Sequence, residues 1–396
     1  YHPYVYPSKA DNALQKLISG IHDQILTEGG WKEGIVTEMG WPTHIGGTGI
    51  SEEQQAIEFV KGYILLEKNG VKVSQMYRMN DPGTNKTYNE DNFGMVRYDG
   101  TPKPAVTAVK EFNQRTAGGI YLGEMKLGNS MTAHMYLKDQ KLVVAAWNKA
   151  GAQNTSDSFD FGTTVEAYDI YGNLIKKGNV IELGESPVYI EGLSADLTAE
   201  NLQFNVKSSL DYSKKLLSES EAYDGYKKIV KMLDEETERL QLAKMPSAEE
   251  SSDYLENHMN IGSKAIELYK AGEFGSDIKN LTSALFMIYL SGRPIMNMYL
   301  ASVNSDVGYI PANEQKIKSV RAELVKKADG GTLSYSEAVL KFAEELEQDA
   351  KQVYSSRDKS RMKSGILKAW DETAGYIAGW AVEAADAETK EYNDIL

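Results

Sequence analysis

One carboxylate stands in a position where an acid could do chemistry. Glu38 directly follows a short apolar run, residues 34–37, and precedes Gly40 and Trp41. The run predicts a buried strand, so Glu38 should lie at the carboxyl end of that strand. The active sites of parallel α/β barrels gather at this end. An ionised carboxylate that attacks an oxocarbenium-like centre, beside an aromatic face for a sugar ring, suits glycoside chemistry. The competing interpretation is a solvated or helix-capping glutamate.

The elements around Glu38 alternate between extended and helical patterns over residues 1–115. Strands and helices that alternate at this spacing favour parallel strands joined by crossover helices. Ser51 and Gln54 have the spacing of a capping box that starts the second helix. The expected order is an extended segment at 1–7, a helix at about 14–25, a strand at 34–37, a helix from 52, a strand at 71–77 and a helix at 104–114.

Residues 117–194 lack helical periodicity and contain several short apolar runs. Residues 138–141 separate two of these runs and predict a hairpin turn. About six short strands in so short a stretch indicate a small antiparallel β-sandwich. The expected strands cover residues 132–137, 142–147, 158–161, 165–170, 180–183 and 188–190.

Residues 195–396 have an almost wholly helical pattern and predict an α-helical bundle of about six helices. Two capping boxes, at Ser247 with Glu250 and at Ser334 with Glu337, mark expected helix starts. The expected breaks lie near residues 245–246, 272–275, 305–311, 330–331 and 355–358.

Composition removes several classes of function. The formal net charge of −14 argues against nucleic acid and anionic membranes as partners. The absence of cysteine excludes disulfides and cysteine-based sites. No apolar stretch approaches the roughly 18 residues that a membrane helix needs. His44, His134 and His258 are scattered without zinc-site spacing, and residues 46–49 lack the Lys-Ser/Thr of a phosphate loop. We therefore expect no metal and no cofactor.

Several motifs in order resemble the closing part of a known catalytic barrel. Residues 1–116 resemble the C-terminal part of the barrel of retaining glycoside hydrolases of clan A, the superfamily of cellulases and β-xylosidases. The matching motifs are His2-Pro3-Tyr4, the T-E-x-G-W run at 37–41, VSQMYRMND at 73–81, FGMV at 93–96 and DGTPKPA at 99–105. The resemblance implies the last three βα units of a (β/α)8 TIM barrel. A trailing β-domain and a helical region would complete the chain.

The resemblance also implies roles for individual residues. Glu38 matches the catalytic nucleophile, and His2 and Tyr4 match residues that bond this carboxylate or the substrate. Trp41 would be a sugar platform, and Tyr77 matches an aromatic position near the end of the eighth strand. The family often has Trp just before that aromatic residue, whereas this chain has Met there. The sugar and the linkage therefore stay open.

A retaining mechanism needs a second carboxylic acid about 5–5.5 Å from the nucleophile. In the family this acid follows an Asn at the fourth strand, and the chain begins at what resembles the sixth. Asn89-Glu90 mimics the motif, but it follows the eighth strand, so we do not expect it to supply the acid. We expect a fragment of a secreted or cell-surface bacterial enzyme, processed or truncated before Tyr1. It should be inactive without the missing N-terminal barrel half of the same polypeptide.

A second hypothesis comes from a different class of function. The chain would be a non-catalytic carbohydrate-binding or cell-surface module, with a degenerate barrel and a helical region that carries the function. The preserved T-E-x-G-W and closing motifs favour the enzyme. In both cases the expected partner is a carbohydrate.

Overall fold

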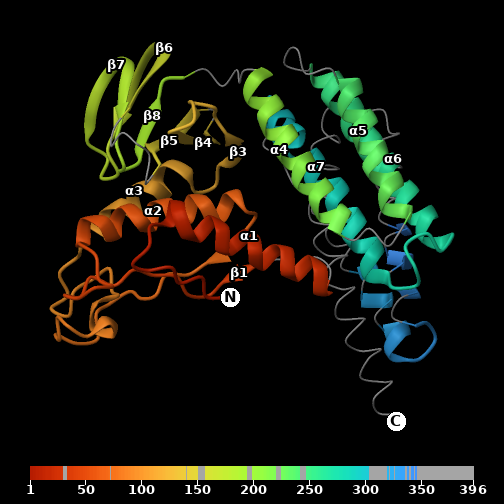
Figure 1. The fold of residues 1–396 in the computed structure, drawn as a ribbon, viewed down its shortest axis with the longest axis horizontal. Coiled ribbons are helices and arrows are strands. Elements are labelled where there is room, and N and C mark those ends of the chain that lie inside the picture. The colour runs from red at the N-terminus through yellow and green to blue at the C-terminus, as the bar shows by residue number, and fades with distance from the viewer. Residues whose placement is uncertain are drawn as a thin grey trace. The chain divides into compact units, whose positions relative to one another are not determined.

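The computed structural model describes most of the chain as far as residue 302 and short pieces beyond it. Two compact units result, Tyr1–His22 with Glu33–Leu197 and Asp23–Lys32 with Thr198–Leu396 (Figure 1). The described residues are 1–29, 34–71, 73–139, 141–149, 157–193, 199–219, 224–240, 247–302, 319–320, 322–324, 326–334, 337–338, 340–342 and 344–345.

The first unit begins with three neighbouring extended segments. Strand β1 (Ile35–Val36) pairs in parallel with β2 (Val73–Ser74). On the other side of β1, the Tyr1 amino group donates to the Ile35 carbonyl at 2.8 Å, and Thr37 N–H donates to the Tyr1 carbonyl at 3.3 Å. In a parallel pair, one residue forms hydrogen bonds to two residues that lie two positions apart on the neighbouring strand. Tyr1 bonds in this way to residues 35 and 37. The first segment, β1 and β2 therefore run side by side.

Helices connect these segments, as the alternating pattern predicts. Helix α1 (Ala10–Gly29) leads into β1, and α2 (Glu52–Lys68) leads from β1 to β2. A long loop with the short 3-10 helix η1 (Asn89–Asn92) then leads to α3 (Pro104–Thr116). These are βαβ crossovers, but their sheet is not closed in the described residues, and the partial TIM barrel remains a prediction.

The start of α2 differs in one detail from the expected capping box. The Ser51 hydroxyl accepts from Gln54 N–H at 3.0 Å, as predicted. The Gln54 side chain does not return to the Ser51 backbone. It donates instead to Glu58 at 2.6 Å and to Glu185 at 3.1 Å. Bonds to these two carboxylates thus take the place of the second hydrogen bond of a capping box, the one between the Gln54 side chain and the Ser51 backbone.

The six strands within residues 120–191 form one antiparallel sheet, so the expected sandwich of two sheets is not confirmed. Residues 162–164 do not end a strand, because β6 continues through them with a shift of register between Asp160 and Val165. The sheet curls enough for Asn148 N–H to donate to the Gly184 carbonyl at 2.7 Å. Its strands are β3 (Ile120–Glu124), β4 (Met131–Lys138), β5 (Lys141–Asn148), β6 (Asp157–Tyr168), β7 (Leu174–Leu183) and β8 (Val188–Glu191), in the order β3-β4-β5-β8-β6-β7.

The central strands of this sheet are buried on both faces. One face of β4 and β5 joins the core formed by α1, α2 and α3, through residues such as Tyr136 and Trp147. The alternate residues, such as Met135 and Val144, are buried on the other face. The sheet and the βαβ elements therefore share one hydrophobic core.

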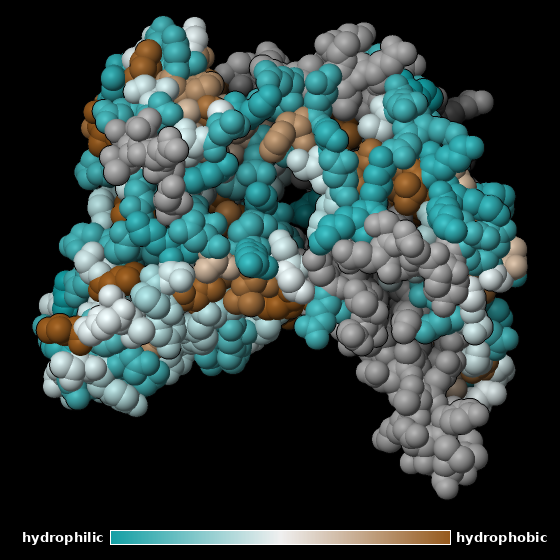
Figure 2. Space-filling model, viewed as in Figure 1, coloured by the Kyte–Doolittle hydropathy of each residue, from teal (hydrophilic) through white to brown (hydrophobic). Residues whose placement is uncertain are grey.

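The described residues of the second unit are mainly helical, as predicted for them. Residues 346–396 of the predicted helical region lie outside the described residues. Helices α4 (Ala199–Glu219), α5 (Asp224–Leu240), α6 (Ala248–Lys270) and α7 (Ile278–Ser302) surround an apolar core. Hydrophilic residues dominate the coloured part of the face that Figure 2 shows. No helix among the described residues is long and apolar enough to cross a membrane.

The helix boundaries of this unit confirm several sequence signals. Ser247 and Glu250 form both bonds of a capping box at the start of α6. Ser334 and Glu337 bond reciprocally in the same way. A turn at 271–277 separates α6 from α7, close to the expected break. The expected breaks near 245–246, 305–311 and 355–358 lie largely or wholly outside the described residues.

Candidate active site

Glu38 lies just beyond the end of β1, as expected, and its side chain is 37% exposed. Its Oε2 accepts a hydrogen bond from the Tyr4 hydroxyl at 3.0 Å and lies 3.4 Å from His2 Nδ1. The other ring nitrogen of His2 is 2.8 Å from the Thr37 hydroxyl. The structure thus brings together three of the residues that the sequence singled out. They come from the first extended segment and from the end of β1.

Gly40 explains how the ends of β1 and β2 come so close. A Cβ atom added to Gly40 would lie 2.2 Å from the Tyr77 carbonyl oxygen, a distance that no side chain allows. The Tyr77 N–H also donates to the Met39 carbonyl at 2.8 Å. A glycine after Glu38 therefore lets the backbone of Tyr77 approach, and this approach brings Tyr77 beside the Glu38 segment.

An aromatic cluster holds Tyr4 and Tyr77 in place. Tyr4, Tyr77 and Phe93 contact one another edge to face, with ring centroids 6.2, 5.9 and 5.4 Å apart. Tyr6 packs against both Tyr4 and Phe93. Such contacts add to the free energy gained by burial and fix ring orientations. The hydroxyl of Tyr4 is thereby directed at Glu38.

Both tyrosine hydroxyls remain protonated donors at neutral pH. Burial, followed by the hydrogen bond to Glu38, raises the pKa of Tyr4 far above its ordinary value. The Tyr77 hydroxyl donates to Glu90 Oε2 at 2.9 Å, and this bond is the main cause that raises the pKa of Tyr77. Two phenol–carboxylate pairs therefore lie in one aromatic cluster.

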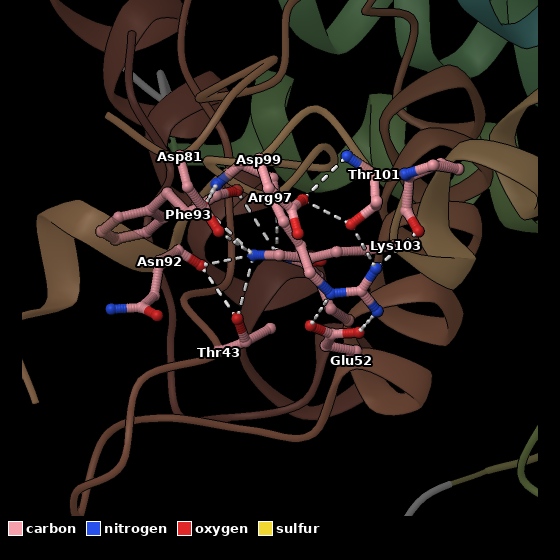
Figure 3. Close-up of polar contacts among 12 residues, drawn as sticks. Thr43, Glu52, Asp81, Asn92, Phe93, Arg97, Asp99, Thr101 and Lys103 are labelled. Carbon is pink, nitrogen blue, oxygen red and sulfur yellow. Dashed lines mark hydrogen bonds and ion pairs between the residues drawn. The ribbon is translucent and has the colours of Figure 1, made fainter. Parts of the chain in front are cut away.

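A buried ion pair anchors the loop that carries Glu90 and Phe93. Lys103, at the N-cap of α3, lies with its Nζ 2.9 Å from Asp81 Oδ2, and both side chains are buried (Figure 3). The same Nζ donates to the Thr43 hydroxyl at 3.0 Å and to the Asn92 carbonyl at 3.2 Å. Asp81 in turn accepts from the Gly94 N–H at 2.7 Å. Lys103 thus ties three segments together.

Two further residues complete this anchor. The Asn92 side chain donates to the carbonyls of Asn85 and Tyr88 at 2.8 and 2.7 Å, so it closes the turn around η1. Arg97 forms a double ion pair with Glu52 at the start of α2 (Figure 3). The loop after β2 is therefore fixed to α2, to α3 and to the loop after β1.

Trp41 lies in the core, not on an exposed face. Its side chain is 1% exposed, its indole N–H donates to the Ser8 carbonyl at 3.0 Å, and its ring packs edge to face on Phe59. A sugar platform needs an open ring face. In this structure Trp41 presents none, and it packs α2 against the β1 segment.

Among the described residues, no group of three or more His, Cys, Asp or Glu side chains could hold a metal ion. His134 and His258 are both fully buried. His44 Nε2 lies within hydrogen-bond distance of the Thr48 hydroxyl of its own loop, at 3.2 Å.

Glu90 is the residue that the sequence argument left aside. Its Asn-Glu motif is visible in the sequence, but its partner, Tyr77, lies 13 residues away along an irregular loop. No periodic pattern predicts a contact of this kind. The buried contacts of Lys103 and Asn92 described above keep Tyr77, Glu90 and Phe93 close to the first extended segment.

Comparisons with known proteins give little further information. No family model matches the chain, and no curated protein matches it. One similar solved structure is a family 39 glycoside hydrolase from the gut symbiont Bacteroides cellulosilyticus WH2. The identity is 18% and the TM-score 0.41, with 48% of this chain and 43% of that chain covered. This chain therefore spans less than half of that protein, and so distant a likeness determines neither the fold nor the activity.

Proposed function

We propose that this chain carries the nucleophile half of a retaining glycoside hydrolase site that acts on an oligo- or polysaccharide. One observation supports it most: Glu38 is partly exposed, with Oε2 held by Tyr4. Among the described residues, none donates a hydrogen bond to Glu38 Oε1. An oriented carboxylate with one uncommitted oxygen is suited to attack an anomeric carbon.

The reaction assigns a role to each residue of this group. The ionised Glu38 attacks the anomeric carbon, a C–O bond forms, and the glycosidic C–O bond breaks. Tyr4 donates to the carboxylate and keeps its orientation, and His2 lies beside the same oxygen. Water then releases the sugar with its configuration retained. The leaving oxygen takes its proton from a second carboxylic acid, which we assign to the missing barrel half.

This assignment leads to a specific expectation for the isolated chain. It should not hydrolyse ordinary glycosides, because their leaving oxygen needs protonation. It should still react with 2-deoxy-2-fluoroglycosyl fluorides, whose leaving group departs without a proton. The 2-fluoro substituent also slows the second step, so the covalent adduct should accumulate.

The test is to incubate the chain with such fluorides of gluco, galacto and xylo configuration. Mass spectrometry of peptides should locate one glycosyl adduct on Glu38. The Glu38→Gln variant should form none, and Glu53→Gln, an exposed control in the same unit, should react like the unchanged chain. Absence of an adduct with all three sugars, or an adduct on another residue, would contradict the proposal. Binding to insoluble polysaccharide without any adduct would favour the non-catalytic module.

A further inference from the structure

We propose that Glu90 is a second carboxylate of this site, which accepts hydrogen bonds from sugar hydroxyls and so helps to select the sugar. Tyr77 is its positioning residue. This inference rests on the proposed function of Glu38, because it places both carboxylates against the same substrate.

An unbroken series of contacts links the two carboxylates. Glu38 accepts from the Tyr4 hydroxyl, and Glu90 accepts from the Tyr77 hydroxyl. The two tyrosine rings touch, with centroids 6.2 Å apart, and Phe93 packs against both. Glu90 also contributes to the raised pKa of Tyr4 through its charge. A molecule that reaches Glu38 over these rings is therefore close to Glu90.

The Glu90 carboxylate can accept more hydrogen bonds than it receives. Its side chain is half-buried, and its Oε2 accepts a hydrogen bond from the Tyr77 hydroxyl. Among the described residues, none donates to Glu90 Oε1, and no cation forms an ion pair with this carboxylate. An ionised carboxylate has room for about four hydrogen bonds. Sugar hydroxyls are donors that match this capacity, and bonds to a charged acceptor are the stronger kind.

Hydrogen bonds on several sides hold the backbone that carries Glu90. Glu90 lies in η1, whose last residue, Asn92, is bonded to the carbonyls of Asn85 and Tyr88. The Asn92 carbonyl accepts from buried Lys103 (Figure 3). A binding group on so firmly held a segment loses little conformational entropy when a ligand arrives.

A purely structural role for Glu90 can be separated by choice of variant. Glu90→Gln keeps an oxygen that accepts from Tyr77, so a residue that only anchors Tyr77 would tolerate this change. A residue that binds hydroxyls through its charge would not. Asp91→Asn is the matched control, because it removes the same charge from the same turn and keeps an acceptor for the Asn85 N–H.

The experiment measures the inactivation of the full chain by the best 2-deoxy-2-fluoroglycosyl fluoride of the panel, as adduct against time and concentration. For Glu90→Gln we expect Ki to rise about 10- to 100-fold, the size of a lost charged hydrogen bond. The limiting rate constant should change less than about 3-fold, because Glu38 and Tyr4 remain. Tyr77→Phe should raise Ki by a smaller factor, and Asp91→Asn should leave it unchanged.

The outcomes distinguish the two proposals. An adduct on Glu38 with equal Ki in Glu90→Gln and the unchanged chain overturns the role of Glu90 alone. A fall in the limiting rate constant with unchanged Ki also overturns it, because Glu90 would then act on Glu38 and not on the sugar. No adduct in the unchanged chain overturns the function of Glu38 and, with it, this inference.

Discussion

The two units of this chain use charge in different ways. Among its described residues, the first unit has two ion pairs in its interior: Lys103 with Asp81 and Lys61 with Asp11, all four side chains at most 7% exposed. In the second unit, every ion pair among the described residues has at least one partner that is a third or more exposed. These pairs include Lys207 with Asp211 and Lys227 with Asp224.

The difference indicates in which unit side chains must be positioned accurately. A buried ion pair gains little net stability, because desolvation of both charges offsets their attraction. Its two partners must nevertheless stay together, since either charge alone would be costly. In the first unit, Lys103 uses this constraint to hold the loop of Glu90 and Phe93. In the described part of the helical unit, the apolar core forms without an ion pair whose two side chains are both buried.

The largest effect should come from breaking the buried pair of the first unit. Lys103→Met leaves Asp81 buried without its cation, and we expect the free energy of unfolding of this unit to fall by about 3–5 kcal/mol. Urea unfolding with pulsed hydrogen exchange, followed by mass spectrometry of peptides, measures each unit separately. Peptides of residues 80–100 should lose protection first, because Lys103 bonds directly to this loop.

Two controls sharpen this test. The double variant Lys103→Met with Asp81→Asn should recover part of the lost stability, because no unpaired charge remains. Peptides of α4–α7 should be unchanged in both variants. If Lys103→Met cost less than about 1 kcal/mol, the distinction between the two units would be lost.

The next prediction concerns a property that both units share. His134 in the sheet and His258 in α6 are fully buried, and burial lowers the pKa of each to about 4. Since the unfolded chain protonates near 6.5, it binds more protons than the folded chain between these values. The free energy of unfolding should therefore fall as the pH drops from about 6.5 to 4, by about 3 kcal/mol per histidine.

The histidines must be separated from the acidic residues, which also lose favourable interactions in acid. His258→Gln should flatten the profile of α4–α7 peptides between pH 6.5 and 4 and leave the sheet peptides unchanged. His134→Gln should do the reverse. The measurement is urea unfolding at each pH with the exchange pulse at one fixed pH. Identical slopes in the variants and the unchanged chain would refute the prediction.

Local signals in the sequence predicted the elements well. The capping boxes at Ser247 and Ser334 specify helix starts through contacts within four residues. Glu38 could be placed at a strand end for the same reason. The curled single sheet could not be predicted, because residues 162–164 resemble a turn. Only pairing with β7 shows that β6 continues.

Only those residues of the site that belong to the sequence motifs could be predicted. His2, Tyr4 and Glu38 were singled out, and they do lie together. The burial of Trp41 follows from α2, whose Phe59 packs on the indole. The bond of Glu90 to Tyr77 depends on a loop fixed by partners about 10 to 50 residues apart, such as Lys103 with Asn92 and Arg97 with Glu52. Such pairings leave no periodic trace in a sequence.

A smaller effect should arise at Gly40, where two backbone segments of the first unit approach each other closely. Gly40→Ala forces a methyl group against the Tyr77 carbonyl, and overpacking of this kind costs about 1–3 kcal/mol. Because the Tyr77 segment must shift, adduct formation on Glu38 should also slow. Gly47→Ala is the matched control, since no atom lies within 4 Å of the added carbon. Equal stability and labelling in the two variants would refute the role of Gly40.

The smallest effect should come from the surface of the helical unit. Lys207 and Asp211, one turn apart on α4, form an ion pair at 2.8 Å with side chains 77% and 54% exposed. Water and salt screen such a pair, so Lys207→Ala should change the free energy of unfolding by no more than about 0.5 kcal/mol. Urea unfolding should give a difference within this bound in about 0.05 M salt and a still smaller one in about 1 M salt. A loss comparable to that of Lys103→Met would show that the helical unit, too, depends on specific charges.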